Sequence, residues 1–221
     1  MNEVYAPRLK VCCISSIQEA ELAISLGADA VGLVSNMPSG PGVISMEKIK
    51  QIAISVPPPI ATFLLTSSRD VKEIILQHSY CRTNTIQICD DLKIGSHREL
   101  KKALPGISIV QVIHVFNEES IRQALALQDN VDAILLDSGN QSKAIKELGG
   151  TGKIHNWQIS NNIREKLNIP IFLAGGIKPE NVKDAIEQVH PFGIDLCSGV
   201  RTAGKLDESK LKKLLVNMGR G

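Results

Sequence analysis

The sequence has few aromatic residues and almost no excess of either charge. Phe, Trp and Tyr make up 3% of its 221 residues, and 25 Lys plus Arg face 23 Asp plus Glu, a formal net charge of +2. A dedicated nucleic-acid-binding protein carries a clear basic excess, so we expect no nucleic-acid partner. No apolar run approaches the ~18 residues of a membrane span, and residues 1–10 lack the pattern of an export signal, so we expect no membrane partner.

Cysteine is also sparse. The five cysteines are odd in number and irregularly spaced, which disfavours a disulfide scaffold and favours free thiols in a reducing compartment. We therefore expect a cytoplasmic protein. Zinc-ligand spacing is missing among the candidate ligands His78, His97, His114, Cys81 and Cys89, so we predict no metal site.

The main feature of the sequence is a repeated alternation of short apolar runs with segments of helical period. The apolar runs cover residues 9–14, 29–34, 59–65, 85–89, 108–113, 132–136, 170–174 and 193–197. They are nearly continuous in Val, Ile and Leu, as in parallel strands that are covered on both faces. Eight units of about 28 residues are close to the ~30 of one strand with its returning helix. The pattern predicts an α/β fold, a single-domain (β/α)8 TIM barrel over residues 1–221, with a doubly wound open sheet as the alternative.

Helix starts support this alternation. Ser16 with Glu19, and Ser96 with Glu99, form predicted capping boxes. Pro179 is predicted in the first turn of the helix that follows the seventh strand.

Two residues with acid–base chemistry lie at predicted strand ends, which a barrel gathers at one mouth. Asp137 follows an apolar strand, where desolvation would raise its pKa and suit it to general-acid catalysis; capping of the following loop is an equal alternative. Cys12 is a candidate base if its surroundings favour the thiolate, with Lys10 as a tuning charge, although a cysteine here is more often a buried apolar residue. Since neighbouring strand residues face opposite sides, we expect only one of Cys12 and Cys13 to face the mouth.

Glycines follow the last two predicted strands. Gly175 and Gly176 lie before a helix start, and Ser198 and Gly199 follow the eighth strand. Backbone amides at such positions bind phosphate, and many barrels hold phosphate at strands 7 and 8. Either motif alone would more often be a turn; the two together favour a phosphate-binding site.

A long glycine-rich connection, residues 138–155, follows the sixth predicted strand. Gly149, Gly150, Thr151 and Gly152 precede Lys153 without the spacing of a nucleotide-binding loop. We expect this segment to be a substrate loop that covers the mouth, with an ordinary surface insertion as the alternative.

In chain order, these segments resemble the phosphoribosylanthranilate isomerase family of tryptophan biosynthesis. The first strand is similar to that family's Lys-Ile-Cys-Gly-Ile motif, and similar motifs recur at residues 27–32, 134–137, 149–157, 175–182 and 195–205. The resemblance implies an Amadori rearrangement of an aminoaldose phosphate in a TIM barrel, without metal or organic cofactor, by a monomer or homodimer. It implies that Asp137 protonates the furanose ring oxygen and that Cys12 takes the proton from C2 of the sugar.

The sequence departs from the family pattern at four places. Residues 36–42 contain no arginine to face the anthranilate carboxylate, and residues 87–91 lack the family's histidine and add a negative charge. Cys13 replaces a glycine, and Arg201 replaces a glutamate, either to compensate for the lost positive charge or as a surface residue.

These departures keep two alternative functions open. One is a paralogous isomerase of another phosphosugar, and the other is a non-catalytic protein that binds a phosphoribosyl ligand. A third alternative concerns the base, because a one-residue shift of the first strand would bring Cys13 to the mouth in place of Cys12.

Overall fold

The computed structural model describes residues 6–139, 148 and 155–220. Its parallel strands close into a barrel in which the last strand pairs with the first, Val11 opposite Leu196. The strands are β1 Arg8–Val11, β2 Ala30–Val34, β3 Ala61–Thr66, β4 Thr85–Ile88, β5 Ser108–His114, β6 Ala133–Asp137, β7 Ile171–Leu173 and β8 Gly193–Leu196. Closure confirms the predicted (β/α)8 barrel and excludes the open doubly wound sheet.

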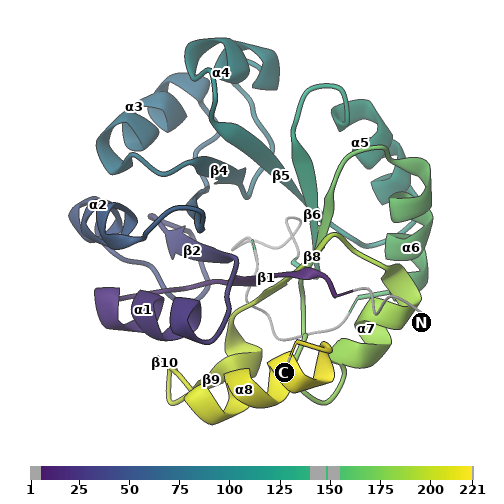
Figure 1. Ribbon diagram of the computed structural model, residues 1–221. Helices are drawn as coiled ribbons and strands as arrows, with labels where there is room; N and C mark the ends of the chain where they lie inside the picture. The colour runs from purple at the N-terminus through teal and green to yellow at the C-terminus, as the bar shows by residue number, and fades with distance from the viewer. Residues whose placement is uncertain (1–5, 140–147, 149–154, 221) are drawn as a thin grey trace.

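Helices surround the barrel as an outer ring (Figure 1). They are α1 Ile17–Ser25, α2 Met46–Ser55, α3 Val71–Cys81, α4 His97–Ala103, α5 Glu119–Leu127, α6 Trp157–Lys166, α7 Val182–Val189 and α8 Glu208–Asn217. A short 3-10 helix, η1 Ser198–Val200, and a hairpin of β9 Arg201–Thr202 and β10 Lys205–Leu206 connect β8 to α8. Within the described residues, no helix has the length and apolar character needed to cross a membrane.

Two of the predicted helix starts are confirmed. The Ser16 hydroxyl accepts a hydrogen bond from the Glu19 amide at 3.1 Å, and Ser96 accepts one from Glu99 at 3.3 Å. These caps satisfy amides that lack a partner inside the helix. The prediction for Pro179 was wrong, because α7 begins at Val182 and Pro179 lies in the turn before it.

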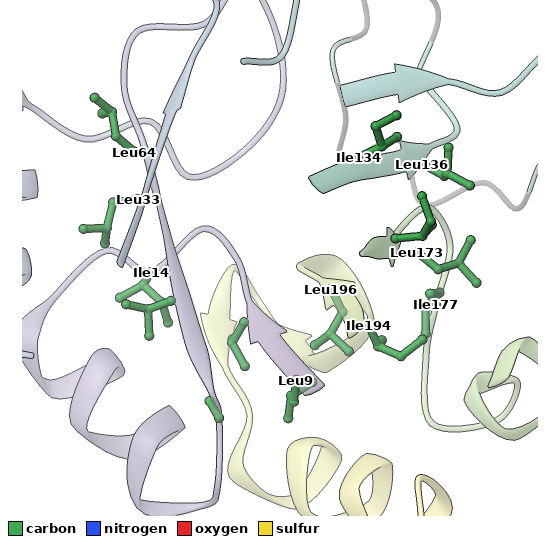
Figure 2. Packing of buried hydrophobic residues seen from close by; sticks show 14 of the residues in the cluster. Leu9, Ile14, Leu33, Leu64, Ile134, Leu136, Leu173, Ile177, Ile194 and Leu196 are labelled. Carbon is green, nitrogen blue, oxygen red and sulfur yellow. The ribbon is translucent and has the colours of Figure 1, made fainter. Parts of the chain in front are cut away.

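Side chains alternate along the strands between two apolar layers. Leu33, Leu64, Ile134 and Leu136 belong to the cluster between strands and helices, part of which is drawn in Figure 2. A second cluster occupies the barrel interior and includes Cys12, Val34, Phe63, Leu65, Val110, Leu135 and Phe172. The residues at the mouth of the barrel pack on this inner cluster.

The first strand is shorter than predicted. The sequence indicated residues 9–14, whereas β1 ends at Val11 because Cys13 has a left-handed backbone with φ +63°. The other strands lie within a few residues of their predicted bounds.

Candidate active site

A pocket lies at the carboxyl ends of the barrel strands. Residues at the ends of seven strands, all except β5, line it. They include Cys12, Cys13, Met37, Leu65, Gln87, Cys89, Asp137, Leu148, Gly175, Gly176, Asp195, Cys197 and Ser198. The predicted acid and the predicted base therefore line the same pocket although 125 positions separate them in the chain.

Cys12 is held firmly at the end of β1. Its amide donates a hydrogen bond to the Leu196 carbonyl at 2.8 Å, and its side chain is almost fully buried. Gly32 on β2 makes room for the sulfur, because a Cβ at Gly32 would lie 2.8 Å from the Cys12 Sγ. A side chain larger than hydrogen at position 32 would displace the thiol from the pocket.

Asp137 is the last residue of β6 and is buried at the pocket wall. Burial raises the pKa of its carboxyl group, and the 2.7 Å hydrogen bond that the Ser138 amide donates to Oδ1 offsets only part of this effect. Gly175 leaves space for the carboxyl group, since a Cβ there would lie 3.0 Å from Oδ1. The surroundings favour the protonated acid.

A buried ion pair lies beneath the two catalytic candidates. Lys10 is fully buried, and its Nζ lies 2.8 Å from Asp195 Oδ1 and 5.0 Å from the centre of the Phe63 ring. Burial alone would lower the pKa of Lys10, but the Asp195 carboxylate outweighs it and raises the pKa. A Cβ placed at Gly32 would lie 3.2 Å from Nζ as well as 2.8 Å from the Cys12 sulfur, so the ammonium group is a close neighbour of the thiol.

The prediction that only one of the adjacent cysteines faces the mouth was wrong. Cys13 lines the pocket together with Cys12. Side chains alternate only while the backbone stays extended, and the positive φ of Cys13 ends that alternation.

Three of the four predicted phosphate-binding residues line the pocket: Gly175, Gly176 and Ser198. Gly199 does not line the pocket. It lies against the segment that follows β7, where a Cβ at Gly199 would be 2.0 Å from the Ile177 carbonyl oxygen. Gly199 thus permits close contact between the segments that follow β7 and β8, and it borders a shallow depression next to the pocket.

The segments that follow β2 and β4 form an uncharged part of the wall. Met37 and Pro41 line it after β2, and Gln87 and Cys89 line it from β4. Asp90, in the segment where the sequence analysis expected added negative charge near the substrate, does not line the pocket; its carboxylate lies 3.7 Å from Arg69 Nε. Among the described residues, no Lys or Arg lines the pocket.

Gln87 is a site residue that the sequence analysis did not select. Its side chain is buried, lines the pocket and leaves Oε1 without a hydrogen-bond partner among the described residues. A buried acceptor without a partner is costly, which makes this oxygen a candidate contact for a polar ligand. The only signal in the sequence was a polar residue inside an apolar strand.

Arg201 is neither a surface residue nor a cation exposed to the pocket. Its guanidinium donates to Glu19 Oε1 at 2.9 Å and to the carbonyls of Cys12 and Cys13 at 3.2 and 2.7 Å. Its side chain is 8% exposed. Arg201 therefore connects the end of β1 to α1, and its positive charge is paired with the carboxylate of Glu19.

The predicted substrate loop, Gly149, Gly150, Thr151 and Gly152, lies outside the described residues. Leu148, which is described, is buried and lines the pocket. Among the described residues, no group of three or more His, Cys, Asp or Glu side chains is arranged to hold a metal ion.

A closed (β/α)8 barrel with an acid and a thiol in the pocket at its strand ends has the architecture of a barrel enzyme. Residues 9–217 match the family model for N-(5'-phosphoribosyl)anthranilate isomerase. N-(5'-phosphoribosyl)anthranilate isomerase 2 of Methanosarcina mazei is 34% identical over 206 residues, which cover 92% of this chain and 90% of that protein. The chain belongs to the N-(5'-phosphoribosyl)anthranilate isomerase family, as its sequence motifs indicated.

Solved structures agree with this assignment. The phosphoribosylanthranilate isomerase of Thermotoga maritima has a TM-score of 0.80 and 30% identity, covering 96% of this chain and 98% of that one. A second solved isomerase holds reduced 1-(o-carboxyphenylamino)-1-deoxyribulose 5-phosphate and has a TM-score of 0.77 at 28% identity, with the same coverage. The chain is accordingly an isomerase of tryptophan biosynthesis.

Proposed function

We propose that this isomerase rearranges N-(5'-phosphoribosyl)anthranilate with Cys12 as general base and Asp137 as general acid. The observation that carries the proposal is that the two side chains, from β1 and β6, line one pocket and that burial raises the pKa of Asp137. An acid that stays protonated and a base in the same cavity are the two groups that an Amadori rearrangement requires.

The reaction follows from these positions. Asp137 gives its proton to the furanose ring oxygen, the C1–O bond breaks, and a Schiff base forms between C1 and the anthranilate nitrogen. The Cys12 thiolate then takes the proton from C2, which produces an enolamine, and the enolamine tautomerises to the ketone. Holding both groups beside one bound sugar replaces encounters in solution with a fixed arrangement.

Lys10 supports the base from below in this proposal. Its ammonium group and the Cys12 sulfur both lie near Gly32, and Lys10 is anchored by Asp195. A buried positive charge next to the sulfur stabilises the negative charge that the sulfur carries when it acts as a base. Lys10 touches no part of the substrate pocket, so it is a positioning residue.

The phosphate end of the substrate is proposed to bind at Gly175, Gly176 and Ser198. Support comes from the pocket lining and from the position of these residues after β7 and β8, where barrels hold phosphate. The solved relative with a bound ribulose 5-phosphate derivative supports a phosphorylated small molecule as the ligand of this pocket. Gly199 would act indirectly, by keeping the two segments close together.

One observation favours a second candidate, a paralogous isomerase that acts on another phosphosugar. The part of the wall formed by β2 and β4 presents no Lys or Arg among the described residues, so nothing described there would pair with an aromatic carboxylate. A bidentate guanidinium contact is not readily replaced by neutral groups.

A substrate panel tests the two candidates. The purified protein is given phosphoribosylanthranilate, followed by the loss of its fluorescence, and in parallel other aminoaldose phosphates that lack the anthranilate carboxylate. We expect turnover of the anthranilate compound. Turnover of another compound alone would establish the paralogue. A third outcome is that the protein binds the ligand without turning it over. If the Cys12→Ala and Asp137→Asn variants then bind with unchanged affinity, the protein is a binding protein.

We also propose a cytoplasmic location and a monomeric or homodimeric state. The five cysteines are free, which suits a reducing compartment. A solved relative is described as dimeric in Thermotoga maritima. Light scattering of the purified protein, and fluorescence microscopy of a tagged copy in its own cells, test the two statements separately.

A further inference from the structure

Three thiols converge at one side of the pocket. Cys12 and Cys13 follow β1, and Cys197 follows β8, the strand that closes the barrel against β1. The pairing of Val11 with Leu196 brings the two strand ends together, and all three cysteines line the pocket. Cys197 is half-buried, so a small reagent in the pocket can reach it.

The Cys13 thiol donates a hydrogen bond to the Pro41 carbonyl at 3.6 Å. The thiols of Cys12 and Cys197 are its other neighbours, and both raise its pKa. Gly42 leaves room for it, because a Cβ at Gly42 would lie 2.5 Å from the Cys13 Cβ. The structure thus accommodates a side chain at a residue whose φ of +63° favours glycine.

The surroundings of Cys13 and Cys197 differ. The hydrogen bond from Cys13, and then the positive charge of Arg201, lower the pKa of Cys197. The contacts with Cys12 and Cys197, together with burial, raise the pKa of Cys13. Cys197 is also the more exposed of the two thiols, so it is the one that a reagent in the pocket reaches first.

We propose that Cys13 and Cys197 are a thiol pair that hydrogen peroxide oxidises to a disulfide, and that this disulfide reversibly inhibits the isomerase. The proposal rests on the three convergent thiols and on access through the pocket. Its effect on activity rests on the proposed role of Cys12, whereas formation of the disulfide does not.

The oxidation takes place in two steps. The Cys197 thiolate attacks one peroxide oxygen, the O–O bond breaks, and the departing hydroxide takes a proton to become water, which leaves a sulfenic acid on Cys197. The Cys13 sulfur then attacks the Cys197 sulfur, the S–O bond breaks, and a second water leaves. The two thiols lose two electrons and two protons in total, and the peroxide is reduced to two waters.

A disulfide at this place would change the surroundings of the base. Cys13 directly follows Cys12, and Arg201 holds the carbonyls of both residues. A bond to Cys197 breaks the hydrogen bond from the Cys13 thiol to the Pro41 carbonyl and pulls the end of β1 towards β8. A small displacement of the base from its position beside the substrate lowers the rate strongly. We therefore expect a roughly tenfold loss of activity that dithiothreitol reverses.

Mass spectrometry of the complete chain tests the disulfide directly. The protein is exposed briefly to hydrogen peroxide, its remaining thiols are blocked with N-ethylmaleimide, and it is digested without reduction. We expect one linked peptide pair, containing Cys13 and Cys197 and lighter than the sum of its parts by two hydrogen atoms. Cys13→Gly and Cys197→Ser should both abolish the pair, whereas Cys81→Ser, a buried cysteine outside the pocket, should retain it.

Activity is measured in the same samples, each variant against its own untreated value. We expect dithiothreitol to restore the wild type and the Cys81→Ser variant. Oxidation of Cys12 alone, or a link from Cys12 to either neighbour, would overturn the proposal. An active Cys12→Ala variant that still forms the Cys13–Cys197 link would instead overturn only the assignment of the base.

Discussion

The two sides of the pocket differ in what they retain of the family pattern. One side, called here the catalytic side because it holds the proposed acid and base, consists of Cys12, Asp137, Gly175 and Ser198 at the ends of β1, β6, β7 and β8. The other, called the uncharged side, consists of Met37, Leu65, Gln87 and Cys89 from β2, β3 and β4. The catalytic side retains the residues that the family resemblance assigns as acid, base and phosphate-binding glycines, whereas the uncharged side lacks the arginine and histidine expected from that resemblance.

In the proposed mechanism, proton transfer and recognition of the aromatic ring are therefore carried by separate parts of the barrel. Strands contribute to the mouth independently, so one set of loops can diverge while the other keeps its geometry. On the catalytic side, the main departure, Cys13, is accommodated by Gly42 and leaves Cys12 in place.

The largest effect on stability is expected from Arg201, which fastens the catalytic side. Arg201→Met should lower the free energy of unfolding by about 3 kcal/mol, because it leaves Glu19 and two carbonyls without their buried partner. Lys212→Met, which breaks an exposed pair with Glu208, should cost at most about 0.5 kcal/mol. Urea unfolding measures both. A stable Arg201→Met protein with only a raised KM would show that Arg201 binds substrate instead.

A smaller effect, on kcat, is expected from a substitution of Gly175. Its missing side chain leaves space for the Asp137 carboxyl group. In Gly175→Ala the new Cβ would meet Ser138 Oγ at 2.8 Å and Asp137 Oδ1 at 3.0 Å, so kcat should fall by roughly 30-fold. Gly106→Ala is the matched control, with a similar φ of +84° and no atom within 4 Å of the new Cβ. Both variants should lose about 1 kcal/mol of stability, but Gly106→Ala should keep its kcat. Equal kcat values would contradict the packing of Gly175 against Asp137.

Asp137, the proposed acid, should decrease the stability of the folded protein. Its pKa is raised in the folded state, so the stability it contributes is present at acid pH and is lost as pH rises through the folded pKa. Asp137→Asn should therefore increase the free energy of unfolding by about 1 kcal/mol at neutral and alkaline pH, and not at acid pH.

Asp207, a partly exposed residue just before α8, should show the opposite dependence of stability on pH. The hydrogen bond from Thr202 lowers its pKa, so its stability contribution is present at neutral pH and is lost as pH falls. Asp207→Asn should decrease stability at neutral pH. Thermal unfolding of both variants across pH measures the contrast, and the same sign for both would contradict the desolvated acid.

The smallest effect is expected from adding a charge to the uncharged side. Met37→Arg should lower KM for phosphoribosylanthranilate by about threefold to tenfold with little change in kcat, because a guanidinium at the wall can pair with the aromatic carboxylate. Met37→Gln controls for the change of shape. An unchanged KM in Met37→Arg would place the carboxylate elsewhere in the pocket.

Much of the fold could be read from the sequence because its signals are local. Continuous Val, Ile and Leu runs separated by capped helices predicted the eight strands, and the order of motifs placed Cys12 and Asp137 at one mouth. The length of β1 and the direction of Cys13 could not be read, because a single left-handed residue decided both.

Contacts between residues far apart in the sequence could not be predicted from it either. Lys10 is paired with Asp195 across 185 positions, and Arg201 reaches Glu19 across 182. Hydropathy and spacing describe neighbours in the chain, so a charge that is neutralised only in the folded barrel looks the same in the sequence as one that is available to substrate.

The assignment of Cys12 as base and Asp137 as acid is tested by the kcat of Cys12→Ala, Asp137→Asn and Cys13→Gly with phosphoribosylanthranilate, measured beside the wild type under reducing conditions. We expect the first two variants each to lose roughly 1,000-fold in kcat and Cys13→Gly to stay within about tenfold of the wild type. An active Cys12→Ala variant together with an inactive Cys13→Gly variant would instead assign the base to Cys13.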